Sequence, residues 1–190
     1  MKIYLENLGK YNDGERLGEW LQLPYTEDEL EELLIRIKVA TRTDGKFTFG
    51  CIDGNRVYEE YAIHDYETEQ EFNLYISEYE QLSRLNDIAQ SLEGFSNDET
   101  QVINAFFKLY SGNVENAELG IRVVEDKQYI FYHDCLTEKD LGYTYMLITN
   151  QLDDIGSEVK KYIDFEKVAK DLLSGGTFVK MDSKYIEFIH

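Results

Sequence analysis

Residues 59–126 carry sixteen acidic side chains and only three basic ones, and this net charge of −13 restricts how the stretch can fold. Like charges at this density repel one another in a compact state, so the carboxylates are expected on solvated faces. The flanking stretches, 1–58 and 127–190, each carry a net charge of only −3. Most of the chain's net charge of −19 therefore lies in its middle third.

These sixteen acids are the candidate partner-binding residues. An acidic run is ordinarily a set of well-solvated helix faces. That interpretation is weakened here because the stretch offers only Arg84, Lys108 and Arg122 as basic partners for i,i+4 pairs. The candidates are Glu59, Glu60, Asp65, Glu67, Glu69, Glu71, Glu78, Glu80, Asp87, Glu93, Asp98, Glu99, Glu115, Glu118, Glu125 and Asp126.

The composition excludes several other classes of protein. Leu, Ile, Val and Phe make up 54 of the 190 residues, more than the ~20% below which a highly charged chain is usually disordered. A strongly acidic chain is not expected to bind nucleic acid through a basic surface. No apolar run approaches the ~18 residues of a membrane span, and the N-terminus lacks the pattern of a secretion signal. The two cysteines, Cys51 and Cys135, lie far apart and fit a cytoplasmic location.

Periodicity predicts strands towards both ends of the chain and helices between them. Capping boxes are expected at Thr26 with Glu29 and at Ser77 with Glu80, and Asp53-Gly54 indicates a hairpin. A turn is expected over residues 9–14. The predicted strands are 2–8, 16–23, 46–52, 56–63, 129–132, 177–180 and 185–189. The predicted helices are 26–37, 77–92, 96–110, 113–119, 137–148, 155–162 and 165–173.

This order of elements predicts an α+β fold in three small modules. The first, residues 1–76, is β-rich with one helix. The second, residues 77–126, is helical and strongly acidic. The third, residues 127–190, mixes helices with strands.

The sequence gives no positive indication of a catalytic or metal site. His133, Asp134 and Cys135 are adjacent, and three consecutive side chains on a strand cannot converge on one ion. His64 has no partner nearby in sequence and is interpreted as a histidine at a strand end. We therefore predict no metal, no cofactor and no catalytic residue. A hydrolase that uses a pair of carboxylates stays open, because 38 acids make some close pair inevitable.

Five segments, in order along the chain, resemble the ArdA antirestriction family. They are IYLENLGKYNDGERLGEWLQLP (3–24), EEYAIHDYE (59–67), LSRLNDIAQSL (82–92), YIDFEKVAKDL (162–172) and GTFVKMDSKYIEF (176–188). The chain departs from the family pattern at Phe165 and Lys170, which keep the size or charge class. Residues 40–56 are longer than the pattern requires and are expected to add a hairpin.

The resemblance implies an elongated protein of three small domains that mimics DNA. Proteins of this family are encoded on mobile genetic elements and occupy the DNA-binding groove of type I restriction–modification enzymes, in their methyltransferase core. The resemblance also implies a homodimer formed by the C-terminal domain. The candidate interface residues are Tyr162, Ile163 and Phe165, in the stretch most like the family motif, and their apolar spacing fits the core of a helix equally well. On the residues alone, an acidic module that regulates another DNA-binding protein is the main alternative.

Overall fold

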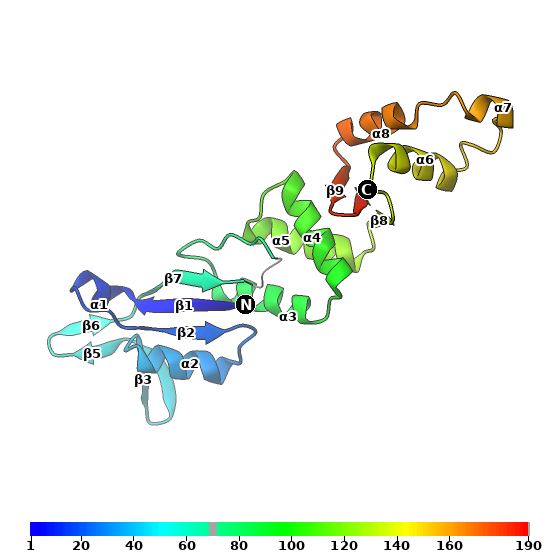
Figure 1. Cartoon of the computed structure of the whole chain (residues 1–190). Helices are drawn as coiled ribbons and strands as arrows, with labels where there is room; N and C mark the ends of the chain where they lie inside the picture. Colours follow the sequence, from blue (N-terminus) through cyan, green and yellow to red (C-terminus); the bar gives the residue numbers. More distant parts are fainter. Residues whose placement is uncertain (69–71, 190) are drawn as a thin grey trace. The chain divides into compact units, whose positions relative to one another are not determined.

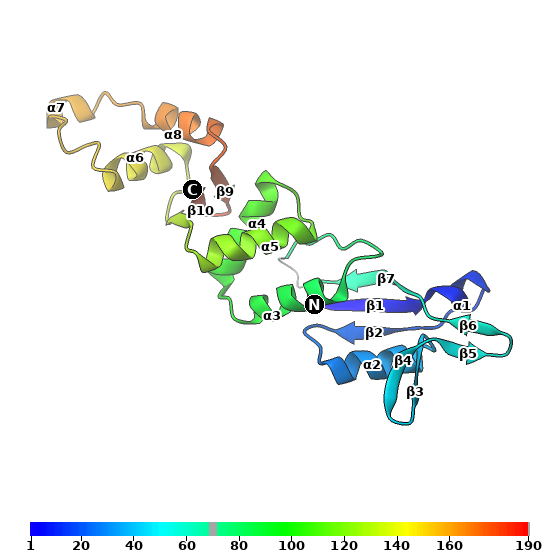
Figure 2. The same ribbon diagram turned by 180° about the vertical axis from the view of Figure 1, so that it is seen from behind.

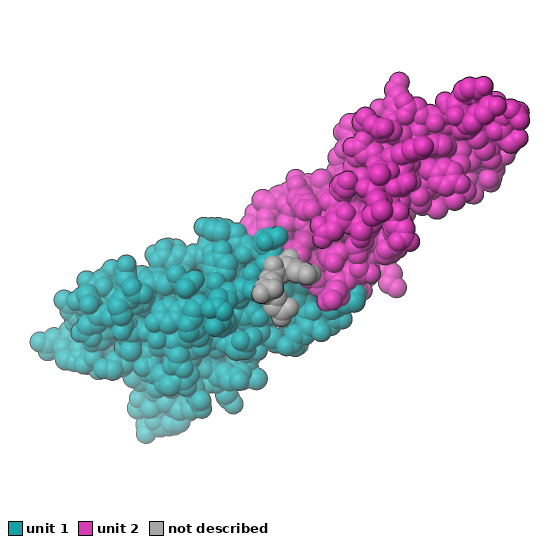
Figure 3. Space-filling view, in the orientation of Figure 1, with its two compact units in different colours: residues 1–96 teal, residues 97–190 magenta. Residues whose placement is uncertain are grey.

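The computed structural model describes residues 1–68 and 72–189, and it divides into two compact units, residues 1–96 and residues 97–190 (Figure 3). Each unit combines small antiparallel sheets with helices, so the chain has the predicted α+β class. The three domains predicted from the sequence, with boundaries after residues 76 and 126, stay a prediction, as does their elongated arrangement.

Unit 1 is built around a three-stranded antiparallel sheet in the order β2–β1–β7 (Figure 1). Ile3 and Leu5 on the central strand are fully buried, which fits the alternation that predicted this strand. The strands of unit 1 are β1 (Lys2–Asn7), β2 (Gly18–Gln22), β3 (Ala40–Thr43), β4 (Lys46–Phe49), β5 (Cys51–Asp53), β6 (Arg56–Tyr58) and β7 (Tyr61–Glu67). Its helices are α1 (Leu8–Asn12), α2 (Glu27–Arg36) and α3 (Leu82–Glu93).

The segment expected to form a turn over residues 9–14 instead begins with the short helix α1, so that prediction is wrong for its first half. The side chain of Asn7 explains the helix: its Oδ1 accepts a hydrogen bond from Lys10 N at 2.8 Å and caps the first turn. Gly9 lets the ring of Tyr58 approach closely, because a Cβ there would lie 2.5 Å from that ring. Turn geometry follows only at Gly14, whose φ is +83°.

Helix α2 begins at the capping box predicted from Thr26 and Glu29. Glu29 N donates to Thr26 Oγ1 at 3.3 Å, and Thr26 N donates to the Glu29 carboxylate at 2.8 Å. Leu33, Leu34 and Ile37 are buried on the face predicted from their helical spacing. This prediction is confirmed.

Two small hairpins fill residues 40–58, where the sequence predicts longer strands. The expected strand 46–52 is divided into β4 and β5 at Gly50, whose φ of +101° is in the left-handed region. The expected strand 56–63 is divided into β6 and β7 at Glu59 and Glu60, so its prediction as one strand is wrong. The hairpin at Asp53-Gly54 is confirmed, and the β3–β4 hairpin is the extra one expected for residues 40–56.

The capping box expected at Ser77 and Glu80 is wrong, because α3 begins five residues later at Leu82. Glu80 is engaged elsewhere: its Oε1 accepts from Gln81 N at 3.1 Å and from Arg84 Nη1 at 3.2 Å. Tyr79, expected on the buried helical stripe, therefore lies in the turn before the helix with 69% of its surface exposed.

Unit 2 contains a helical pair, α4 and α5, and a second three-stranded sheet in the order β8–β10–β9 (Figure 2). Helix α5 runs well past the end expected near Leu119. The helix α7 is shorter than the expected 155–162. The strands are β8 (Tyr129–Tyr132), β9 (Phe178–Met181) and β10 (Lys184–Phe188). The helices are α4 (Asn97–Leu109), α5 (Val114–Glu125), α6 (Glu138–Ile148), α7 (Ser157–Lys160) and α8 (Phe165–Ser174).

Close helix contacts in unit 2 depend on glycines that bring backbones together. Gly120 on α5 faces Ile103 on α4, and a Cβ there would lie 3.1 Å from the Ile103 Cγ2. Gly142 on α6 packs directly against the backbone of Phe165, which leaves no room for a side chain. Behind α6 and α8 lies a core that contains Tyr132, Leu141 and Tyr185.

Candidate partner-binding surface

Of the sixteen candidate acids, the fourteen that lie among the described residues are all accessible, and none is buried. Glu69 and Glu71 lie outside the described residues. Glu80, Glu99 and Glu118 are half-buried. The exposed ones are Glu59, Glu60, Asp65, Glu67, Glu78, Asp87, Glu93, Asp98, Glu115, Glu125 and Asp126.

Most of the exposed acids that the structure describes between residues 59 and 126 have no cationic partner among the described residues. Glu67 pairs with Lys2 at 3.1 Å, Asp98 pairs with Lys184 at 2.5 Å, and Glu78 lies 3.5 Å from a ring nitrogen of His64. Within residues 1–68 and 72–189, the other eight form no ion pair. We call these eight the unpaired acids: Glu59, Glu60, Asp65, Asp87, Glu93, Glu115, Glu125 and Asp126.

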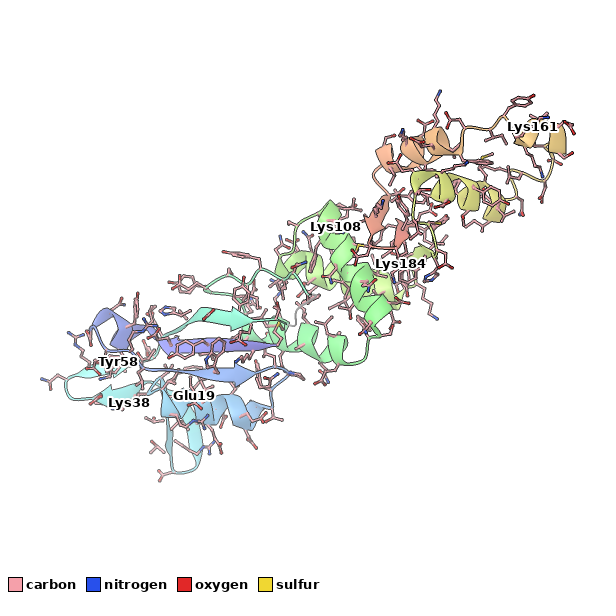
Figure 4. All side chains as sticks on the ribbon, in the orientation of Figure 1. Glu19, Lys38, Tyr58, Lys108, Lys161 and Lys184 are labelled. Atoms are coloured by element: carbon pink, nitrogen blue, oxygen red, sulfur yellow. The ribbon has the colours of Figure 1, made fainter. Side chains whose placement is uncertain are left out.

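The basic residues of this stretch do little to neutralise it. Arg84 binds Glu80 at 3.2 Å, a half-buried acid. Lys108 donates instead to the backbone oxygen of Lys180 at 3.1 Å, and both Lys108 and Lys184 are labelled in Figure 4. No ion pair among the residues that the structure describes therefore compensates the charge of the unpaired acids.

The acids of residues 1–58 behave differently, since seven of the eleven form ion pairs. Arg36 binds both carboxylate oxygens of Glu19, at 2.8 and 2.9 Å. Asp53 accepts from both Lys10 and Lys38 at 2.9 Å, and Glu19, Lys38 and Tyr58 are labelled in Figure 4. These contacts join α2 to strand β2, and the β5–β6 hairpin to α1 and to the loop after α2, so here the charges support the fold.

One acid that sequence reasoning missed is fully buried. Glu6 on β1 has no exposed surface, and its two oxygens lie 2.5 Å from Arg16 Nε and 2.5 Å from His64 Nδ1. His64 is therefore not an isolated histidine at a strand end, as its sequence suggests, because antiparallel pairing of β1 with β7 supplies its partner. Strand alternation predicts that Glu6, next to the buried Leu5, is exposed. In the structure Leu5, Glu6 and Asn7 are all buried, so the alternation does not predict the burial of Glu6.

The adjacent residues His133, Asp134 and Cys135 are directed to different surroundings. His133 is exposed beside the ring of Phe131, whereas Cys135 is buried in the core of unit 2. Among residues 1–68 and 72–189 there is no group of three histidine, cysteine or acidic side chains that could hold a metal ion. In the same part of the chain, no helix is long and apolar enough to cross a membrane.

Two further features stand out on the surfaces of the units. In unit 1, Leu8, Glu59, Glu60, Tyr61 and Tyr79 line an open hollow of about 340 Å³. In unit 2, apolar side chains of α6, α7 and the following turn are exposed. This second set comprises Tyr143, Leu147, Ile148, Val159 and Tyr162.

The three candidate interface residues differ in how much of their surface is exposed to solvent. Tyr162 has 79% of its surface exposed, and the cation of Lys161 lies 5.3 Å from its ring centre. Ile163 and Phe165 are half-buried, and the Phe165 ring packs edge-on against Tyr143 at 5.3 Å. Of the three, Tyr162 has the most surface to offer a partner.

The sequence was compared with models of known protein families. The model of the antirestriction protein family ArdA matches residues 3–187 of the chain. The chain belongs to the ArdA antirestriction family. The match covers nearly the whole length and confirms the resemblance of the five sequence segments. No curated protein sequence matches the chain.

Membership of the ArdA family makes this an antirestriction protein. The acidic stretch and the helical pair of α4 and α5 both lie inside the matched residues.

Proposed function

We propose that this protein is a DNA mimic that occupies the DNA-binding groove of type I restriction–modification enzymes, in their methyltransferase core, and blocks restriction and modification. The observation that carries the proposal is the set of unpaired acids, which have no cationic partner in the part of the chain that the structure describes and give a strongly negative surface. Family membership supports the same conclusion.

The amount of charge is compatible with a DNA-like particle. Duplex DNA carries one negative charge per ~1.7 Å of its axis. The net charge of −19 therefore corresponds to about 32 Å of duplex for one chain, and to about 65 Å for a dimer. Condensed counterions offset part of the charge of DNA, so a mimic of lower charge density can still compete.

Carboxylates are chemically suited to replace phosphates in such a groove. Both accept two parallel hydrogen bonds from an arginine guanidinium, and both attract lysine. This mechanism needs no catalytic residue and no cofactor, so inhibition is expected to be stoichiometric. It also needs no direct contact with nucleic acid or membrane. We also propose that the protein acts in the cytoplasm and is encoded on a mobile genetic element. There an antirestriction protein would protect the incoming DNA of the element.

Titration against a type I methyltransferase bound to labelled DNA tests the proposal. We expect the protein to displace the DNA at a near-equimolar ratio, with no turnover of DNA or protein. Binding to the enzyme without displacement would favour the alternative of an acidic module that regulates a DNA-binding protein. Catalytic, sub-stoichiometric inactivation would instead favour a carboxylate-pair hydrolase.

We also propose that two copies associate through the C-terminal residues 127–190, at the surface that contains Tyr162. Exposed apolar side chains on α6 and α7 support this, because contiguous apolar surface commonly marks an interface between proteins. Residues 127–190 carry a net charge of only −3, so two copies repel one another less there than through residues 59–126.

Light scattering at micromolar concentration and moderate salt tests the dimer. We expect twice the chain mass of 22.3 kDa, and a shift towards the monomer when Tyr162 is changed to Asp. Tyr11→Asp, at another exposed tyrosine in unit 1, is the matched control and should leave the mass unchanged. A constant mass of one chain at every concentration would contradict the dimer.

A further inference from the structure

The open hollow in unit 1 is lined by two acidic residues, two tyrosines and one leucine. Tyr61 is the first residue of β7, Glu59 and Glu60 form the break between β6 and β7, and Leu8 begins α1. Tyr79 comes from the turn before α3, which the sequence had placed inside a helix.

Backbone hydrogen bonds fix these segments with respect to one another. Leu8 N donates to Glu60 O at 3.0 Å, so the start of α1 is tied to the break between the strands. Ile63 N donates to Glu78 O at 2.9 Å, so the turn that carries Tyr79 is tied to β7. The hollow is therefore formed by the fold itself and not by side chains that happen to meet.

The chemistry of the lining selects a cation. Glu59 and Glu60 are exposed, and neither forms an ion pair with any residue in 1–68 or 72–189. The rings of Tyr61 and Tyr79 offer faces that attract a cation by their quadrupole. An uncharged ligand would gain less from the two carboxylates than a cation would, and an anion would be repelled.

The local potential agrees with this. The neighbouring carboxylate of Glu78 raises the pKa of Tyr79, and partial burial and the charge of Glu60 add to the effect. The raised pKa of Tyr79 therefore reports a negative potential at the hollow, which favours a cation.

We propose that this hollow binds the guanidinium group of an arginine side chain presented by the partner enzyme. A guanidinium is planar, so it stacks on a tyrosine ring while its fork of N–H groups bonds to carboxylates. The methylene stem of arginine matches the apolar contact that Leu8 provides. A lysine ammonium is a compact, strongly hydrated point charge, so it uses the rings less well.

This inference rests on the proposed function, because an arginine that normally contacts a phosphate is the group that a DNA-binding groove would present. It adds a specific anchor to a surface whose other acids act through their summed charge. Two changes of equal charge therefore separate the anchor from the general field. Glu59→Gln with Glu60→Gln removes the anchor, and Glu125→Gln with Asp126→Asn removes two unpaired acids of unit 2.

A titration with small cations tests the hollow without any restriction enzyme. The probes are N-acetyl-L-arginine methylamide and N-acetyl-L-lysine methylamide at matched ionic strength, followed by the backbone amide NMR shifts of Leu8, Glu60 and Tyr61. We expect the arginine probe to saturate these shifts at a concentration about fivefold or more below the lysine probe. The variant E59Q/E60Q should lose the response and E125Q/D126N should keep it. Equal responses to both probes, or in both variants, would overturn the proposal.

Competition with DNA for a type I methyltransferase tests the role of the anchor in the complex. We expect E59Q/E60Q to weaken competition about tenfold more than E125Q/D126N does. Tyr79→Ala should weaken it about fivefold, whereas Tyr79→Phe keeps the ring and should cost less than twofold. Tyr75→Ala, at another tyrosine with 65% of its surface exposed, is the control and should also cost less than twofold.

The possible failures are distinguishable. If the wild-type protein displaces DNA and the two double variants lose the same amount, the arginine site is wrong and the mimic stands. If the arginine probe binds selectively but the wild-type protein never displaces DNA, the site stands and the proposed function is wrong.

Discussion

Residues 1–58 and residues 59–126 both display many carboxylates, and the structure uses them in opposite ways. In the first stretch, seven of eleven acids are held by lysine or arginine, as Glu19 is held by both donors of Arg36. In the second, eight exposed acids have no cationic partner among residues 1–68 and 72–189. The paired acids of residues 1–58 stabilise contacts between elements. The unpaired acids of residues 59–126 are accessible to a cation on another protein.

Because the two stretches differ in ion pairing, net charge alone does not identify a binding surface. Neutralised pairs contribute little to a long-range field, and exposed ion pairs stabilise a fold only weakly, by about 0–1 kcal/mol. Unpaired carboxylates do the reverse, since they repel one another within the fold and attract a basic groove. The two stretches can therefore be told apart by experiments that measure binding and stability separately.

The largest effect is expected from removing several unpaired acids together. Each exposed charge contributes roughly 0.2–1 kcal/mol, so six substitutions should weaken competition with DNA about 100-fold and flatten its dependence on salt. The measurement is displacement of labelled DNA from a type I methyltransferase at several salt concentrations. The six changes are Glu59→Gln, Glu60→Gln, Asp87→Asn, Glu93→Gln, Glu115→Gln and Glu125→Gln.

A matched control changes six acids of residues 1–58 and alters the net charge equally. We expect it to have at most about a tenth of that effect on competition, because several of these carboxylates are already paired. Equal losses in both variants would contradict the comparison and leave only total charge as the determinant. The control changes are Asp13→Asn, Glu15→Gln, Glu19→Gln, Glu31→Gln, Glu32→Gln and Asp53→Asn, all at acids that form ion pairs.

The second effect in size concerns the buried carboxylate that supports the fold. Glu6→Gln removes charge-assisted hydrogen bonds to Arg16 and His64. A hydrogen bond to a charged group contributes about 1.5–3 kcal/mol to stability. We expect the free energy of unfolding of unit 1 to fall by about 2 kcal/mol, measured by urea denaturation.

Glu60→Gln is the comparison variant, because this acid is exposed and unpaired among the described residues. Its free energy of unfolding should change by less than about 0.5 kcal/mol. A Glu6 variant as stable as wild type would mean that Arg16 and His64 find equivalent partners in water.

Much of the fold follows from local patterns, and the failures occur where distant residues decide. The Thr26 capping box lies in one turn of chain and was predicted correctly. The similar pattern at Ser77 failed because the turn that follows it is tied to β7, where Ile63 N donates to Glu78 O at 2.9 Å, and the local sequence does not reveal that distant contact. Strand breaks at Gly50 and at Glu59-Glu60 likewise depend on how the hairpins pack.

The candidate surface shows the same limit. The sequence located the excess of acids, since counting charges requires no structure. It could not show which acids are paired across strands, as Glu67 is with Lys2, or that the side chain of Glu6 contacts His64. Those contacts depend on the register of β1 with β7, which a single sequence does not determine.

A smaller effect is expected from any one acid of the 59–126 stretch. Glu67→Gln or Glu99→Gln should weaken competition with DNA by at most about fivefold, or about 1 kcal/mol, because the field is a sum of many charges. Displacement of labelled DNA measures it at a fixed salt concentration. Complete loss of inhibition from either change would point to a specific site and not a distributed surface.

The smallest effect concerns a paired acid and its response to pH. Lys10 and then Lys38 hold the pKa of Asp53 below its ordinary value of 3.8. A carboxyl group with a lowered pKa in the folded protein contributes stability above its unfolded pKa, and that contribution is lost as the pH falls through the folded value. Asp53→Asn should therefore lower the melting temperature by a few degrees at pH 7, and the difference from wild type should close below pH 3.8.

Circular dichroism melts between pH 7 and pH 2 measure this difference. Asp44→Asn in the neighbouring hairpin is the control, because Asp44 forms no ion pair among residues 1–68 and 72–189. A difference that stays constant across this range would mean that Asp53 contributes through packing or geometry, and that the pairing of acids in residues 1–58 matters less to the fold than its geometry suggests.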